Sequence, residues 1–96
     1  MPGSCVTVFP GSPDRVVIHG DIDIRNAPEI DDAFSALTGD VQVDCVGVGF
    51  IDTAGFHALD RAYDTARARG SSFTVSGLNT FATLVGEFLG SPYLSK

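Results

Sequence analysis

The sequence predicts an α/β fold in which a mixed central sheet of about four strands carries helices packed on one face. Segments rich in β-formers alternate with segments of helical periodicity in the order ββαβαβα. This alternation favours parallel strands joined by right-handed crossovers, with the helices layered against the sheet. With 96 residues, of which 44% are hydrophobic and 19% charged, the composition is that of an ordinary globular protein. We therefore expect residues 1–96 to form a single domain.

Two β-rich segments open the chain. Residues 4–9 and 15–19 are rich in valine, and the turn cluster 10–14 between them contains two prolines and a glycine. Together they predict a hairpin. The connection that follows, residues 20–25, carries Asp21 and Asp23.

The first helix is expected to begin near Asn26, which resembles an N-cap with Glu29 as its capping-box partner. Apolar residues then recur at helical spacing until Gly39. These residues are Ile30, Ala33, Phe34 and Leu37.

The second half of the chain repeats the pattern of strand, loop and helix twice. A strand is predicted at residues 41–46 and another at 73–76, and Gly70 is expected to stop the second helix. The second helix has an apolar stripe of Phe56, Leu59, Tyr63 and Ala66, and the third has Phe81, Leu84, Val85 and Phe88. Gly86 lies inside the third helix, where glycine costs about 1 kcal/mol relative to alanine.

Three predicted loops should meet at one edge of the sheet. Ligand and partner sites in α/β sheets usually lie beyond the carboxyl ends of the strands. Residues 20–25, 47–55 and 77–79 all follow predicted strands. We therefore expect the functional surface there.

Composition and charge exclude several functions. The net charge is −6 and Lys96 is the only lysine, so no basic face is available for nucleic acid. The apolar runs are too short to cross a membrane, and the N-terminus lacks the features of a secretory signal, so we expect a cytoplasmic protein. In that reducing compartment Cys5 and Cys45 are interpreted as two buried thiols.

Catalytic motifs are weak or missing. Gly47-Val48-Gly49 lacks the third glycine of a dinucleotide fingerprint, and a P-loop would need an internal lysine. We find neither a nucleophile elbow nor Cys/His metal spacing, so no cofactor, metal or enzymatic activity is expected.

The motifs in the three loops and the flanking helices resemble those of the STAS domain family, in particular its anti-sigma factor antagonists. The match includes Gly-Asp-Ile-Asp at residues 20–23, Ala-Pro-Glu-Ile at 27–30 and Phe-Ile-Asp-Thr-Ala-Gly-Phe at 50–56. It continues through residues 66–70 and 79–90, so it covers nearly the whole chain. The resemblance implies a STAS-like fold.

The resemblance also implies a mechanism. In the family, a partner kinase phosphorylates the serine or threonine that follows the aspartate of this loop, and Thr53 occupies that position. The unphosphorylated antagonist binds the anti-sigma factor, an ATP-dependent kinase, and phosphorylation ends the binding. The implied partner-binding residues are Asp21, Asp23, Asp52, Thr53, Ala54, Gly55 and His57, with Asp44 as structural support of the loop.

Plainer interpretations stand beside these roles. Asp52 fits a helix N-cap, Gly55 fits close packing, and Asp21 and Asp23 fit solvated turn positions. Phe56 is expected in the core.

A second function within the family is a small STAS subunit that binds the ATPase of a phospholipid-transport ABC system. Those proteins resemble this chain in their brevity and in Asp-Thr-Ala-Gly at residues 52–55. Ile22-Asp23-Ile24 leading to residues 27–29 is more similar to the antagonists. Many antagonists also continue beyond the position of Gly90 into a further strand and helix, which are expected to be missing or reduced here.

Overall fold

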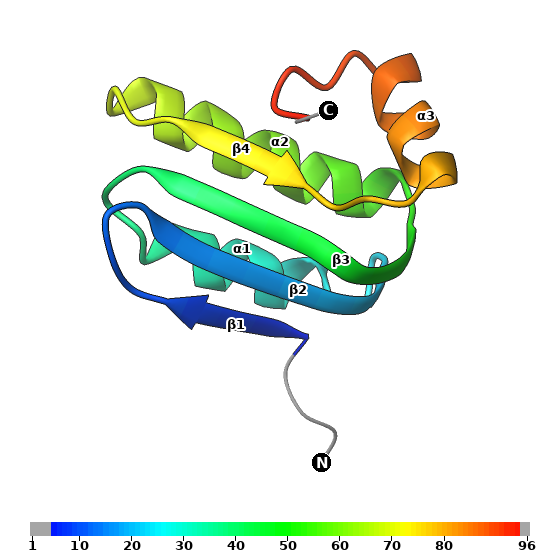
Figure 1. Ribbon diagram of the computed structural model, residues 1–96, viewed down its shortest axis with the longest axis horizontal. Helices are drawn as coiled ribbons and strands as arrows, with labels where there is room; N and C mark the ends of the chain where they lie inside the picture. Colours follow the sequence, from blue (N-terminus) through cyan, green and yellow to red (C-terminus); the bar gives the residue numbers. More distant parts are fainter. Residues whose placement is uncertain (1–4, 95–96) are drawn as a thin grey trace.

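The computed structural model describes residues 5–94 and contains one four-stranded sheet with three helices (Figure 1). The elements in chain order are β1 (Val6–Phe9), β2 (Asp14–Ile22), α1 (Ala27–Ser35), β3 (Val41–Ile51), α2 (Thr53–Ala68), β4 (Phe73–Ser76) and α3 (Thr80–Phe88). The sheet order is β1-β2-β3-β4, with β1 antiparallel to β2 and the other pairs parallel. The predicted fold class and element order are confirmed.

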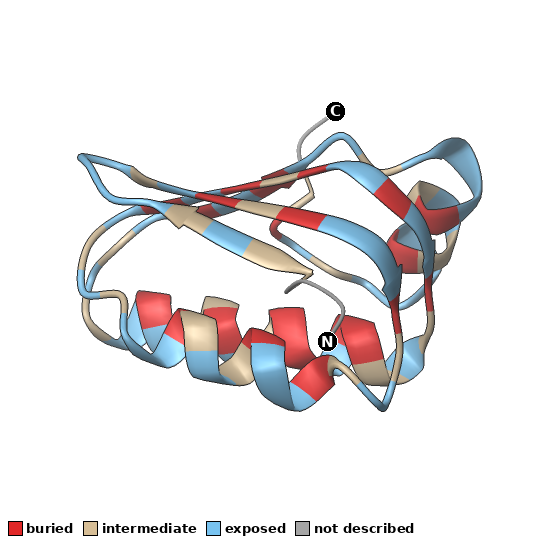
Figure 2. Ribbon diagram, turned by 90° about the horizontal axis from the view of Figure 1, so that it is seen from below, coloured by how far each residue is buried: buried red, intermediate tan, exposed pale blue. Residues whose placement is uncertain are grey.

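The core lies between one face of the sheet and the helices α1 and α2. Figure 2 shows both helices on the same side of the sheet, with buried ribbon on the sides that face it. Alternate residues of β2, β3 and β4 point into this layer because successive strand side chains face opposite ways. The buried strand residues include Val16, Ile18, Val41, Val43, Cys45, Phe73 and Val75, and the helices add Ile30, Phe34, Leu59 and Phe56, which confirms Phe56 as a core residue.

β2 and β3 are longer than the sequence predicts, and they extend into two of the expected loops. Their parallel pairing continues to Asp21 opposite Phe50 and Ile22 opposite Ile51. Gly20 has φ +87°, a backbone conformation that glycine adopts readily, and the register shifts beside it. Only Asp52 separates the end of β3 from the start of α2.

The start of α1 differs from the predicted capping box. Asn26 occupies the N-cap position, but its backbone is helical (φ −105°, ψ −2°) and its side chain makes no capping hydrogen bond. Its amide instead accepts from the Asp23 N–H (2.8 Å) and donates to the Asp21 carbonyl. The side chain therefore ties the end of β2 to the start of the helix.

α3 lies beyond the end of β4 (Figure 1). The sequence located its apolar stripe but did not indicate which side of the helix is buried. Its buried residues are Ala82 and Gly86, whereas most of the predicted apolar stripe faces solvent. A Cβ at Gly86 would lie 2.7 Å from Leu94 Cδ1 and 3.0 Å from Phe56 Cε1. The glycine therefore permits close packing that offsets its low helix propensity.

The segment after α3 makes a reduced further strand. Val75 N–H donates to the Tyr93 carbonyl (2.8 Å), and Leu94 forms an isolated parallel bridge with Val75. Cys5 is half-buried and Cys45 buried, and both are free thiols. Within residues 5–94, no helix combines the length and the apolar character needed to span a membrane.

Candidate docking surface at the carboxyl edge of the sheet

The three predicted segments meet at the carboxyl edge of the sheet. Asp52 N–H donates to the Ile22 carbonyl (3.1 Å), which joins the ends of β2 and β3. The Asn79 amide donates to the Gly49 carbonyl (3.0 Å) and thereby attaches the segment after β4. We call this surface, formed by residues 20–26, 49–57 and 77–79, the carboxyl edge.

The turn from β3 into α2 is held by a helix cap and by close packing. Asp52 is extended (φ −99°, ψ −175°), and its Oδ1 accepts from the Gly55 N–H at 3.0 Å. A Cβ at Gly55 would lie 2.7 Å from Ile51 Cγ1 and 2.8 Å from Ile22 Cγ2. The N-cap role of Asp52 and the packing role of Gly55 are therefore confirmed.

Thr53 is the first residue of α2 and is exposed. The first turn of a helix has unsatisfied N–H groups and the positive end of the helix dipole, which favour negative charge. Ala54 is half-buried, while His57 is exposed and lies four residues further along, so it neighbours Thr53 on the helix surface. The structure thus presents the Thr53 hydroxyl and the His57 imidazole on one exposed patch.

The two acids of the first segment differ in their surroundings. Asp21 is exposed in β2, and its Oδ1 lies against Gly49, where a Cβ would come within 3.3 Å. Asp23 is half-buried and paired with Arg25 (2.8 Å), whose backbone N–H also donates to Asp23 Oδ1 (2.9 Å). The Arg25 guanidinium and this N–H hold the pKa of Asp23 below its usual range. Asp23 therefore organises the turn after β2, and Asp21 is the more accessible acid.

Asp44 lies far from the Asp52 turn, and its partner in the sheet is Ser76, at the end of β4. Because β3 continues to Ile51, Asp44 lies eight residues before Asp52, roughly 26 Å away along an extended strand. Its carboxylate accepts from the Val46 N–H (3.0 Å) and pairs with Arg15 (2.8 Å). The hydrogen bond from the Val46 N–H lowers the pKa of Asp44 most, and the hydrogen bond from Arg15 lowers it further. The expected support of the Asp52 loop by Asp44 is therefore not what the structure shows.

Two apolar residues of the carboxyl edge were missed by the sequence analysis. Ile24 is 74% exposed and Phe50 is 45% exposed. Phe50 precedes the buried Ile51 in β3, so strand alternation pointed to an outward side chain once β3 was known to extend that far. The edge therefore combines apolar side chains with acidic ones.

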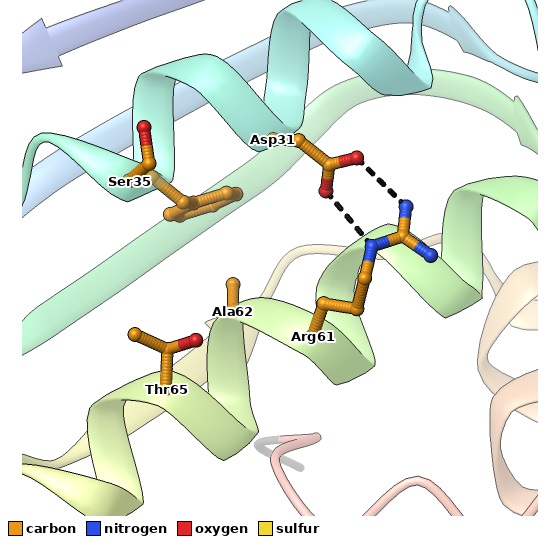
Figure 3. Close-up of a pocket in the computed structure, with 6 residues that line it drawn as sticks. Asp31, Ser35, Arg61, Ala62 and Thr65 are labelled. Carbon is orange, nitrogen blue, oxygen red and sulfur yellow. Dashed lines mark hydrogen bonds and ion pairs between the residues drawn. The ribbon is translucent and has the colours of Figure 1, made fainter.

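A pocket of about 340 Å³ lies elsewhere, between α1 and α2 (Figure 3). Its lining includes Phe34 and Ala62, and Arg61 spans it through an ion pair to Asp31 at 2.8 Å. None of the predicted site residues lines it. Among residues 5–94, no group of three or more His, Cys, Asp or Glu side chains could hold a metal ion.

Comparisons with known proteins agree with this architecture. Residues 5–89 match the family described as "Mlab, STAS domain". No curated protein matches the sequence significantly.

Solved structures share the fold at low sequence identity. SpoIIAA, an anti-sigma factor antagonist, in its unphosphorylated form aligns with a TM-score of 0.74 and 12% identity over 95% of this chain and 87% of that chain. The Bacillus cell fate determinant SpoIIAA in the phosphorylated form aligns with a TM-score of 0.75 and 14% identity over 94% and 88% of the two chains. A sulfate transporter family protein from Wolinella succinogenes aligns with a TM-score of 0.68 and 21% identity over 92% of this chain and 80% of that chain.

The family match covers 85 consecutive residues, including the carboxyl edge and the whole of α3. The chain belongs to the STAS domain family.

Proposed function

We propose that this chain is an anti-sigma factor antagonist, a single STAS domain that binds an anti-sigma factor kinase through the carboxyl edge. Phosphorylation of Thr53 by that kinase ends the binding, which regulates sigma-factor-dependent transcription in the bacterial cytoplasm. The chain itself acts without cofactor or catalysis. The observation that carries the proposal is an exposed Thr53 directly after the capping Asp52, at the edge where the three segments meet.

The surroundings of Thr53 support a switch that acts on binding. Phosphate adds about −1.5 to −2 charges at neutral pH and three strong acceptors. The cap of α2 comes from Asp52 rather than from the Thr53 hydroxyl, so the added group leaves the fold in place. It places a bulky charged group beside Asp52 on the surface that the partner covers. The two surfaces then no longer fit each other, and the phosphate must lose its water on docking, so binding weakens.

The carboxyl edge also indicates the chemistry of the partner surface. Ile24 and Phe50 are apolar and exposed, and Asp21 adds negative charge beside them. Apolar anchors with a charged rim are typical of specific protein interfaces. The complementary partner surface has an apolar pocket with basic residues around it.

Four baits test the proposal: wild type, Thr53→Ala, Thr53→Glu and Thr80→Glu. Thr80 is the matched control, because it is an exposed first residue of a helix, α3, behind the side-chain cap Asn79. Each bait is used to recover partners from the cytoplasm of the source organism, and mass spectrometry identifies the partner and maps phosphate. The affinity for the recovered partner is then measured with purified proteins.

Recovery of an ATP-binding anti-sigma kinase with phosphate on Thr53 supports the antagonist function. Thr53→Ala should bind and resist release by ATP, and Thr53→Glu should lose at least about tenfold in affinity, equivalent to about 1.4 kcal/mol. Thr80→Glu should bind like wild type. Equal phosphorylation of wild type and Thr53→Ala, or equal affinity of Thr53→Glu, would refute the role of Thr53.

The second candidate function is the small STAS subunit that binds the ATPase of a phospholipid-transport ABC system. The match to the family described as "Mlab, STAS domain" and the likeness to a sulfate transporter family protein support it. Recovery of an ABC ATPase by both wild type and Thr53→Ala, without phosphate on Thr53, would establish this alternative.

A further inference from the structure

The solvent-facing side of α3 carries three large apolar side chains. Phe81 is 65% exposed, Leu84 59% and Phe88 90%. Positions i, i+3 and i+7 lie on one helix face, and we call these three residues the α3 stripe. A continuous apolar stripe that faces water indicates an interaction surface.

The packing beneath α3 determines which side of the helix faces solvent. The opposite face packs through Ala82 and Gly86, and a Cβ at Gly86 would collide with Leu94 and Phe56. A rotation that buried the α3 stripe would bring larger side chains into this space. The stripe therefore stays exposed unless another molecule covers it.

The charge distribution restricts what can cover the α3 stripe. The chain has net charge −6, yet Glu87 is the only charged residue within α3. A membrane surface with anionic lipids attracts basic segments, and α3 has no basic residue. A surface that covers the stripe must itself be apolar and nearly uncharged, and α3 meets both conditions.

The order of residues in α3 makes the helix complementary to itself. The apolar pattern Phe81-x-x-Leu84-Val85-x-x-Phe88 is identical in both directions along its eight residues, apart from the exchange of leucine and valine at its centre. A two-fold axis near Leu84 sets two copies antiparallel, so that Phe81 of one protomer faces Phe88 of its partner, and the reverse. With the two-fold axis midway between Leu84 and Val85, the two Glu87 positions lie about 7.5 Å apart along the direction of the helices, at a rise of 1.5 Å per residue.

We propose that the α3 stripe is a two-fold interface between two copies of this chain. Aromatic pairs of this kind stabilise a contact beyond the area they bury. With the neighbouring Leu89, the stripe exposes on the order of 500 Å² per protomer if a large apolar side chain offers about 200 Å². Complete coverage of these side chains on both protomers would bury on the order of 1,000 Å², the lower limit of specific interfaces. The dimer is therefore weak and depends on concentration.

Sedimentation equilibrium over a micromolar-to-millimolar series tests this interface with wild type, Phe88→Ser and Ile24→Ser. Ile24 is the matched control, because it is also a large apolar residue, 74% exposed, but lies after β2 and outside α3. Wild type and Ile24→Ser should dimerise with the same dissociation constant. Phe88→Ser should raise that constant at least about tenfold, because each of the two protomers loses its Phe88 ring from the interface. Unchanged thermal unfolding of Phe88→Ser, measured by circular dichroism, shows that the fold is retained.

A wild type that stays monomeric throughout the series would overturn the interface, as would a Phe88→Ser variant that dimerises like wild type. An Ile24→Ser variant that weakens the dimer as much as Phe88→Ser would move the contact away from α3. The inference is independent of the proposed switch, because Thr53→Glu should dimerise like wild type whether or not it binds a kinase.

Discussion

At the scale of single residues, Gly55 decides how closely the first turn of α2 approaches the sheet. Its Cα lies over the ends of β2 and β3, where a methyl group would meet Ile51 Cγ1 at 2.7 Å, Ile22 Cγ2 at 2.8 Å and the Ile22 carbonyl at 3.1 Å. The carbonyl cannot move without disturbing its hydrogen bond from Asp52. Thr53 is thus positioned by a glycine two residues away.

We expect Gly55→Ala to destabilise the protein by about 1–3 kcal/mol, the usual cost of overpacking a tight site. Gly39→Ala is the control, because nothing lies within 4 Å of a Cβ at Gly39. Urea unfolding of both variants measures the difference. A Gly55→Ala variant as stable as Gly39→Ala would show that the turn accommodates a side chain.

Two ion pairs orient acidic side chains near the sheet. Asp23 pairs with Arg25 two residues away, whereas Asp44 pairs with Arg15 from the neighbouring strand β2. Both pairs are close to water, where such pairs contribute at most about 1 kcal/mol. Their main effect is to orient side chains, whereas the carboxylate of Asp52, the residue before Thr53, caps α2.

At the scale of elements, the segment after α3 covers one end of the core through Tyr93. Its hydroxyl donates to Asp60 Oδ1 at 2.6 Å, and its ring packs edge-on against Phe73 at 5.7 Å between centroids. Burial, followed by the Asp60 carboxylate, raises the pKa of Tyr93. The short segment therefore joins α2 to the edge of β4.

Tyr93→Phe should lose about 1 kcal/mol at neutral pH, the net value of one hydrogen bond. The wild type should also lose stability as the pH rises above about 10, because the unfolded chain ionises there while the folded state keeps the phenol neutral. Stability from this raised pKa is fully present below that pH. Chemical unfolding at a series of pH values should show a smaller alkaline loss in Tyr93→Phe, and parallel curves for the two proteins would contradict this.

At the scale of the whole molecule, the reactivity of the Cys45 thiol measures global unfolding. It lies in the middle of β3, fully buried, and burial followed by the charge of Asp44 raises its pKa to about 12. Cys5 is only half-buried at the edge of the sheet, although burial and Glu29 also raise its pKa. The two thiols thus differ in what must move before a reagent reaches them.

Iodoacetamide should therefore modify Cys5 well before Cys45, since only an accessible thiolate reacts. In a Cys5→Ser variant, the labelling rate of Cys45 should rise with urea at the slope of global unfolding. Mass spectrometry of timed samples measures both rates. Labelling of Cys45 in native buffer as fast as Cys5 would reveal a local opening of β3.

Local signals in the sequence determined the order of the elements, the stop at Gly70, the cap at Asp52 and the buried Phe56. Each depends on residues that are close in the chain: a capping side chain, a glycine with φ +80°, or a repeat at helical spacing. The proposed role of Thr53 likewise rests on a short motif, through its resemblance to the STAS family. Such features need no knowledge of what lies across the sheet.

Only the tertiary structure decided how far β2 and β3 extend, where Asp44 points and which side of α3 is buried. Strand length depends on a partner strand that satisfies backbone hydrogen bonds, so glycine-rich residues 47–49 remain in β3 because β2 pairs with them. Periodicity shows which side chains share a helix face, but the packing of neighbours selects the face that is buried. In α3 the close approach of Phe56 and Leu94 requires Gly86, and the phenylalanines consequently face solvent.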